Sequence, residues 1–174
     1  MELKKNIVNL DTQYKRRVQK YLESGIECPL VLIESDPGRG KSELVADYLE
    51  RNDYSSGWIR LRRLDNWEFF FWDHFVSSLT EVYPFLEIEL KKKRFPENRA
   101  KLSELLDFLH AKTKNQYRGV LVIENYYILE NERIRLFLEH FVEAGFENIC
   151  LIVISNLKTN LQDVCLQSNV RMSY

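Results

Sequence analysis

A short glycine-rich stretch, ESDPGRGKSELV, has residue types and spacing that suit phosphate binding. Gly38 and Gly40 allow a tight turn that points backbone N–H groups at phosphate oxygens. Lys41 would reach the β- and γ-phosphates of a nucleotide, and the Ser42 hydroxyl would contact Mg²⁺. The pattern G-x-x-x-x-G-K-S/T has glycine where this chain has Ser35. The predicted nucleotide-binding residues are Asp36, Pro37, Gly38, Arg39, Gly40, Lys41, Ser42 and Glu43.

The segments on either side of this loop support the prediction. Residues 29–34 (PLVLIE) are almost wholly apolar, which is typical of a strand buried on both faces of a sheet. Residues 41–51 place their apolar side chains on one face of a helix, whose N-terminus would add positive potential at the loop. The alternative is a glycine-rich turn with an incidental lysine.

A second motif follows another apolar run, GVLVIEN. A P-loop enzyme needs an acid at the end of a buried strand to hold the Mg²⁺ shell, and Glu124 supplies one. Asn125 stands where a second acid would orient the attacking water. We therefore predict Ser42 and Glu124 as metal-associated residues, and Glu124 and Asn125 as the catalytic pair. The alternative is a strand-end carboxylate that faces solvent.

The elements that must position these residues alternate along the chain. Strands are predicted over 29–34, 55–62, 119–125 and 149–155. Two polar residues, Ser155 and Asn156, stand at the end of the last strand, where they can sense a γ-phosphate. Helices are predicted over 12–24, 41–51, 67–82, from Pro96 onward, and over 130–143, and the tail NVRMSY is a candidate last strand. This order predicts a doubly wound α/β fold, with a mostly parallel sheet and helices on both faces.

An aromatic stripe and a basic run are expected to have structural roles. The helix over 67–82 has an aromatic stripe, Trp67, Phe70, Phe71 and Phe75, which we expect in the core or at a domain interface. The basic run 91–94 is expected on a solvated connection.

The composition of the chain argues against nucleic acid, zinc and a membrane as partners. The chain has 174 residues, which suits one domain, and a net charge of −1, which gives no electrostatic reason to bind nucleic acid. Its three cysteines form no metal-binding pattern and indicate a reducing cytoplasm. No apolar run is long enough for a membrane span.

Four stretches resemble the ATPase domain of STAND-class P-loop NTPases, in particular the large LuxR-type, MalT-like transcriptional regulators. SDPGRGKSELV resembles the family's loop, in which a small residue at the position of Ser35 is ordinary. GWIRLRRLDN resembles its second strand, FFFWDHFVSSL the helix that follows, and VLVIENYYIL the strand that ends in Asp-Asp-Tyr-His. The resemblance covers roughly residues 12–156.

The resemblance implies roles and also shows departures. It assigns phosphate binding to Lys41, and metal contact to Ser42 and Glu124. Asn125 replaces the second acid, Tyr127 the histidine, and Asn156 an arginine. It also implies that residues 1–174 are a single nucleotide-binding domain, excised from a regulator that continues into winged-helix, sensor-repeat and helix-turn-helix domains.

Three functions remain open at this point. The first is a switch domain that binds ATP or ADP with Mg²⁺, hydrolyses it slowly or not at all, and self-associates when ATP is bound. The second is a phosphotransferase such as a small-molecule kinase. The third is a protein-interaction module with a vestigial P-loop, which exposed Trp67 and Phe70 would support.

Overall fold

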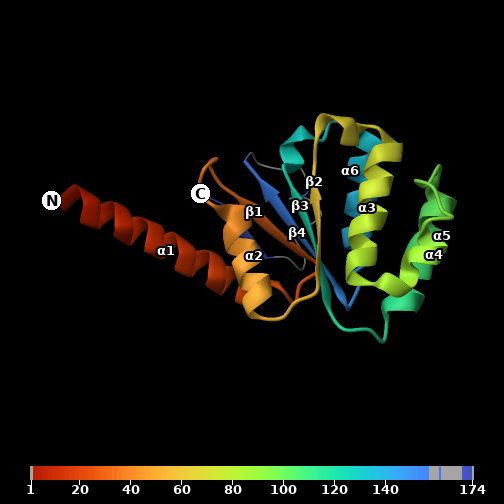
Figure 1. Ribbon diagram of the computed structural model, residues 1–174. Helices are drawn as coiled ribbons and strands as arrows, with labels where there is room; N and C mark the ends of the chain where they lie inside the picture. The colour runs from red at the N-terminus through yellow and green to blue at the C-terminus, as the bar shows by residue number, and fades with distance from the viewer. Residues whose placement is uncertain (1, 157–160, 162–169, 174) are drawn as a thin grey trace.

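The chain folds around one parallel β-sheet, shown in Figure 1 as a computed structural model that describes residues 2–156, 161 and 170–173. The strands are β1 (Leu30–Glu34), β2 (Ser56–Arg60), β3 (Gly119–Glu124), β4 (Ile149–Ser155) and β5 (Val170–Ser173). They lie in the order β2-β3-β4-β1-β5, and every pair of neighbours is parallel. The predicted doubly wound fold is confirmed, and the tail supplies a fifth strand.

Two apolar clusters cover the two faces of the sheet. On one face, α1 (Glu2–Gly25) and α2 (Lys41–Arg51) pack on the side chains of β1, β3 and β4 that point toward them. On the other face lie α3 (Glu68–Val82), α5 (Arg99–Thr113) and α6 (Glu132–Glu143). The short α4 (Glu87–Leu90) packs beside α3 (Figure 1). Strands β1, β3 and β4 are buried throughout, which explains why they read as continuous apolar runs.

Short 3₁₀ turns follow two of the strands and one of the helices. They are η1 (Arg63–Asn66) after β2, η2 (Pro84–Leu86) after α3, and η3 (Tyr126–Ile128) after β3. No helix in the described part of the chain is long and apolar enough to cross a membrane.

Several predicted boundaries were wrong. The first helix begins at Glu2, ten residues before the predicted start at 12, because no glycine or proline interrupts that stretch. The helix predicted from Pro96 begins at Arg99, since Asn98 caps it by accepting a hydrogen bond from the Lys101 N–H. The strand predicted over 55–62 ends at Arg60.

The aromatic stripe of α3 is only partly in the core. Phe71 and Phe75 are fully buried and stack on each other, and Phe75 also stacks on Trp72. Trp67 and Phe70, predicted on the same inward stripe, are exposed. Trp67 precedes the first residue of α3 and has extended backbone angles, so the helical spacing that the stripe assumed does not apply to it.

A close contact between β2 and α3 explains the Gly-Trp pair at the start of β2. A Cβ atom on Gly57 would lie 2.0 Å from the backbone oxygen of Ser78 in α3. The Ser78 hydroxyl also donates a hydrogen bond to the Trp58 carbonyl at 2.8 Å. Glycine at 57 therefore lets the helix backbone approach the strand directly.

We predict that Gly57→Ala destabilises the fold, because the added methyl group would overlap backbone atoms of α3. Overpacking of this kind costs about 3 kcal/mol of unfolding free energy. Urea denaturation followed by circular dichroism measures the change. Ser77→Ala, an exposed substitution on the same helix, should stay within about 0.5 kcal/mol of the wild type. A fully stable Gly57→Ala variant would contradict the close packing.

Candidate phosphate-binding site

The loop between β1 and α2 adopts a conformation that depends on its glycines. Gly38 and Gly40 have φ angles of 79° and 65°, in the left-handed region that side chains disfavour. Gly40 directly precedes α2, so the loop opens onto the N-terminus of that helix. Asp36, Pro37, Gly38 and Arg39 are exposed around it. This is the geometry that presents backbone N–H groups to an anion.

Ser35 causes no strain in this loop. Among the described residues that are not glycine, only Asp53 and Asn125 have a positive φ, so position 35 does not require glycine. Ser35 is buried, and its hydroxyl lies 3.2 Å from the Tyr14 hydroxyl of α1. Its backbone N–H donates to the Ser155 carbonyl of β4. Serine at this position is therefore a packed part of the sheet edge.

Lys41 reaches back into the loop. Its ammonium group donates hydrogen bonds of 2.9 Å to the carbonyl oxygens of Ser35 and Asp36, and one of 2.9 Å to Asn156 Oδ1. Burial lowers the pKa of Lys41; the negative charge of Asp36 opposes this shift and the positive charge of Arg39 adds to it. A phosphate that enters the loop would have to replace one or more of these three oxygen atoms as the hydrogen-bond acceptor of Lys41.

The Asn156 contact brings a predicted strand end to the loop. Asn156 follows β4, which pairs with β1 on one side and with β3 on the other. The end of β4 therefore lies between the loop and Glu124, where a side chain can contact whatever Lys41 binds. Sequence reasoning named Ser155 and Asn156 for this position, and Asn156 contacts Lys41 directly.

Glu124 ends β3 as a buried carboxylate. Its Oε2 atom accepts a 2.5 Å hydrogen bond from Nε of Arg60, the last residue of β2. Its Oε1 atom is also buried and has no hydrogen-bond partner among the described residues. The alternative of a carboxylate facing solvent is wrong, since Glu124 is only 4% exposed. A buried oxygen without a partner marks a place for a further donor, a water molecule or a cation.

The predicted site residues are not all joined by direct contacts. No hydrogen bond connects Ser42 to Glu124 within the described residues, and Ser42 is half-buried at the first turn of α2. Glu43 is exposed in the same turn, and its Oε2 atom would lie 3.6 Å from a Cβ on Gly40. Glu43 therefore folds back over the loop.

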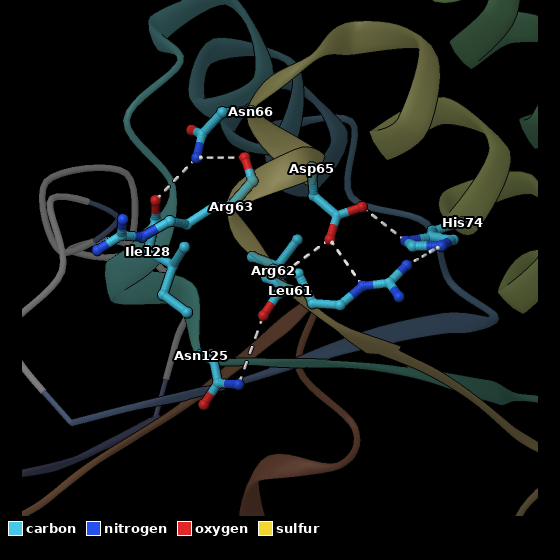
Figure 2. Close-up of polar contacts among 8 residues, drawn as sticks. All are labelled: Leu61, Arg62, Arg63, Asp65, Asn66, His74, Asn125 and Ile128. Atoms are coloured by element: carbon cyan, nitrogen blue, oxygen red, sulfur yellow. Dashed lines mark hydrogen bonds and ion pairs between the residues drawn. The ribbon is translucent and has the colours of Figure 1, made fainter.

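Asn125 has a conformational role that the sequence did not indicate. Its φ of 59° is left-handed, a region that asparagine enters more readily than most residues. Its side-chain nitrogen lies 3.5 Å from the Leu61 carbonyl, as Figure 2 shows. The amide thus points toward the end of β2.

Two polar groups missed by sequence reasoning hold the segment after β2. The Asn66 side chain donates to the carbonyls of Arg63 and Ile128, and its oxygen accepts from the N–H groups of Glu130 and Asn131. Figure 2 shows Asn66 bridging toward Ile128 from the turn η1. The Asp-Asn pair in the sequence was a signal, but three of the partners of Asn66 lie more than sixty residues away.

Asp65 is the second polar group that stabilises the turn η1. The buried Asp65 places Oδ1 2.6 Å from His74 Nδ1 and accepts from the Arg62 N–H at 2.7 Å (Figure 2). Arg62 also lies 2.8 Å from His74 Nε2. The turn that follows Arg60 is therefore held by three charged or polar side chains.

Comparison with known proteins supports the fold class. No family model matches the chain. The serine/threonine-protein kinase PknK of Mycobacterium tuberculosis (strain CDC 1551 / Oshkosh) is 28% identical over 148 residues, which cover 81% of this chain and 13% of that protein. The same match is found in strain H37Rv and in Mycobacterium bovis. The chain thus spans about an eighth of the length of these relatives.

Two solved structures are similar in shape. Cdc6p from Pyrobaculum aerophilum matches with a TM-score of 0.51 at 12% identity, over 93% of this chain and 45% of that chain. PCH-2 of C. elegans matches with a TM-score of 0.46 at 13% identity, over 94% and 41%. At such identities the likeness to Cdc6p shows the fold alone. With the parallel sheet and the glycine loop after β1, it supports a doubly wound α/β fold with a P-loop-like segment.

We predict that Asn66→Ala weakens the connection between the turns after β2 and β3. Four hydrogen bonds would be lost, at about 1 kcal/mol each before relaxation, so the expected loss of unfolding free energy is roughly 3 kcal/mol. Urea denaturation gives the value, and Asn115→Ala, at an exposed position in the turn before β3, serves as the matched control. A loss below about 1 kcal/mol would show that water replaces the Asn66 contacts.

Proposed function

We propose that this chain is a nucleotide-binding switch domain that holds ATP or ADP and hydrolyses it slowly or not at all. One observation carries the proposal: two left-handed glycines place Lys41 at the N-terminus of α2, with its ammonium group inside the loop. Backbone N–H groups, the helix terminus and one cation converge there, which is the combination that binds phosphate. The resemblance to STAND-class regulators supports the same reading.

The roles of the site residues belong to this proposal. Lys41 would bind the β- and γ-phosphates, and the loop Asp36–Glu43 would surround them. Mg²⁺ would be held by Ser42 and Glu124 and would neutralise phosphate charge. The buried Glu124 Oε1 atom, which has no partner in the described part of the chain, fits such a contact.

Slow hydrolysis follows from Asn125. An amide can hydrogen-bond a water molecule but cannot take its proton, and this amide lies beside the Leu61 carbonyl. Asn156 adds a second reason, because its side chain is uncharged where the family has arginine, and it already holds Lys41.

The biological setting is part of the proposal. A single domain of a cytoplasmic LuxR-type transcriptional regulator would use the bound nucleotide to bias contacts with its other domains and with further copies. The mycobacterial match supports a place within a longer protein, since it spans 13% of that relative. The name of that relative describes the whole protein and does not assign its activity to this segment.

The phosphotransferase alternative gains no support from the described residues. The basic run 91–94, which it would need beside the transferred phosphate, follows α4. Figure 1 shows α4 and α5 beyond α3, across the sheet from α2 and its loop.

An interaction surface remains a second candidate, favoured by exposed aromatic side chains. Trp67 is 69% exposed and Phe69 is 76% exposed at the start of α3, with Leu64 and Phe70 also exposed. Apolar side chains gathered in this way often mark a contact with another protein. This surface is compatible with a working loop, since the two lie on different elements.

Lys41→Ala tests the nucleotide-binding proposal. Loss of the ammonium group removes at least one charge-assisted contact to phosphate, so affinity should fall by about 3 kcal/mol, or roughly a hundredfold. Calorimetric titration of ATP and ADP, each with Mg²⁺, measures the change, and Lys114→Ala is the matched exposed control. Absence of heat with the wild type would refute the switch and the phosphotransferase together. Turnover of about 1–100 s⁻¹ would instead favour a phosphotransferase.

Asn125→Asp tests the reason given for slow hydrolysis. A carboxylate at this position can accept a proton, and its repulsion from the Leu61 carbonyl would turn it away from β2, so we expect ATP hydrolysis to rise by at least about tenfold. Phosphate release under single-turnover conditions measures the rate. Asn115→Asp controls for the added charge. An unchanged rate would mean that Asn156, or the position of residue 125, limits the reaction instead.

A further inference from the structure

Arg60 occupies a position that neither the motif nor the resemblance explains. It ends β2, directly opposite Glu124 in the parallel register of β2 and β3. Its Nε atom lies 2.5 Å from Glu124 Oε2, while its side chain is 75% exposed and that of Glu124 is 5% exposed. The guanidinium of Arg60, which is exposed to solvent, thus neutralises the buried carboxylate of Glu124.

The same guanidinium also feels the charge of a carboxylate at the start of α2. The hydrogen bond and charge of Glu124 raise the pKa of Arg60, and the charge of Glu43 raises it further. Glu43 lies in the first turn of α2 and folds back toward Gly40. Arg60 is therefore within electrostatic reach of two carboxylates, one at the end of β3 and one over the loop.

These carboxylates need a cation when phosphates enter. Two negative side chains beside the loop would repel the nucleotide unless a positive charge lies among them. A divalent ion is the usual source of that charge in P-loop sites. Here Arg60 already holds one of the two Glu124 oxygens, and its charge would also repel a divalent ion placed at the other oxygen.

We propose that Arg60 supplies at Glu124 the positive charge that a divalent ion supplies elsewhere, so that this loop binds nucleoside phosphates almost independently of Mg²⁺. The proposal rests on the proposed nucleotide-binding function. It assigns Arg60 as a specificity-determining residue, one that sets which cation accompanies the nucleotide. Mg²⁺ would still be held by Ser42 and Glu124, but its contribution to affinity becomes small while Arg60 is in place.

The test compares ADP affinity with and without Mg²⁺ by calorimetry, using excess EDTA for the metal-free arm. For the wild type we expect the two affinities to agree within about threefold. For Arg60→Gln we expect Mg²⁺ to strengthen binding by about tenfold or more, a difference that calorimetry resolves readily. Arg51→Gln is the control, because Arg51 is also exposed and paired with a carboxylate, Asp47 at 2.8 Å, at the far end of α2.

Two further measurements distinguish the loss of the positive charge from misfolding of the Arg60→Gln variant. Arg60→Lys keeps the positive charge and should keep the wild-type indifference to Mg²⁺. Mn²⁺ titration of the ADP-bound proteins, followed by electron paramagnetic resonance, should show about tenfold tighter Mn²⁺ binding to Arg60→Gln than to the wild type, as expected when a like charge is removed.

The outcomes separate the two proposals. A wild type that binds no ADP in either arm refutes nucleotide binding, and with it the role of Arg60. A wild type that binds ADP with Mg²⁺ but loses tenfold or more in EDTA overturns only the role of Arg60. An Arg60→Gln variant that responds to Mg²⁺ as the wild type does also overturns it.

Discussion

The pairing of β4 between β1 and β3 is the constraint on which the candidate site depends. It places Glu34 beside Ser155 and Glu124 beside Ile154, so three strands end at one edge of the sheet. Because all three strands are parallel, the segments that follow them all begin at the carboxyl end of the sheet. The loop after β1, Asn156 after β4 and Glu124 at the end of β3 are neighbours for this reason alone.

Each of the two charges buried at this edge is stabilised by polar partners. Lys41 is held by the Ser35 and Asp36 carbonyls and by Asn156, and Glu124 is held by Arg60. Such charges would be costly to bury without partners. The result is an edge that satisfies most of its own polar groups, so an entering phosphate competes with protein acceptors for Lys41. This competition would suit the proposed switch, because the contacts of Lys41 would change when a phosphate binds.

Most elements could be predicted because their signals are local. A strand buried on both faces has to be apolar along its length, and a helix on a sheet has to be apolar along one side, so β1, β3, β4, α2 and α6 are readable from composition and period. Predictions failed where a boundary depended on one hydrogen bond, as at Asn98, or where a residue adopted extended angles, as at Trp67. Helical spacing shows which residues share a face but does not show where the helix begins.

The sequence by itself determined the types of residue at the site and the loop that holds them. Gly38, Gly40 and Lys41 act within a few residues of one another, and local sterics and a helix N-terminus suffice to predict their arrangement. Only the tertiary structure decided that Arg60 meets Glu124, and that Asn156 meets Lys41, across 64 and 115 residues. Those contacts follow from strand order and register, which depend on packing of the whole sheet and leave no local trace in the chain.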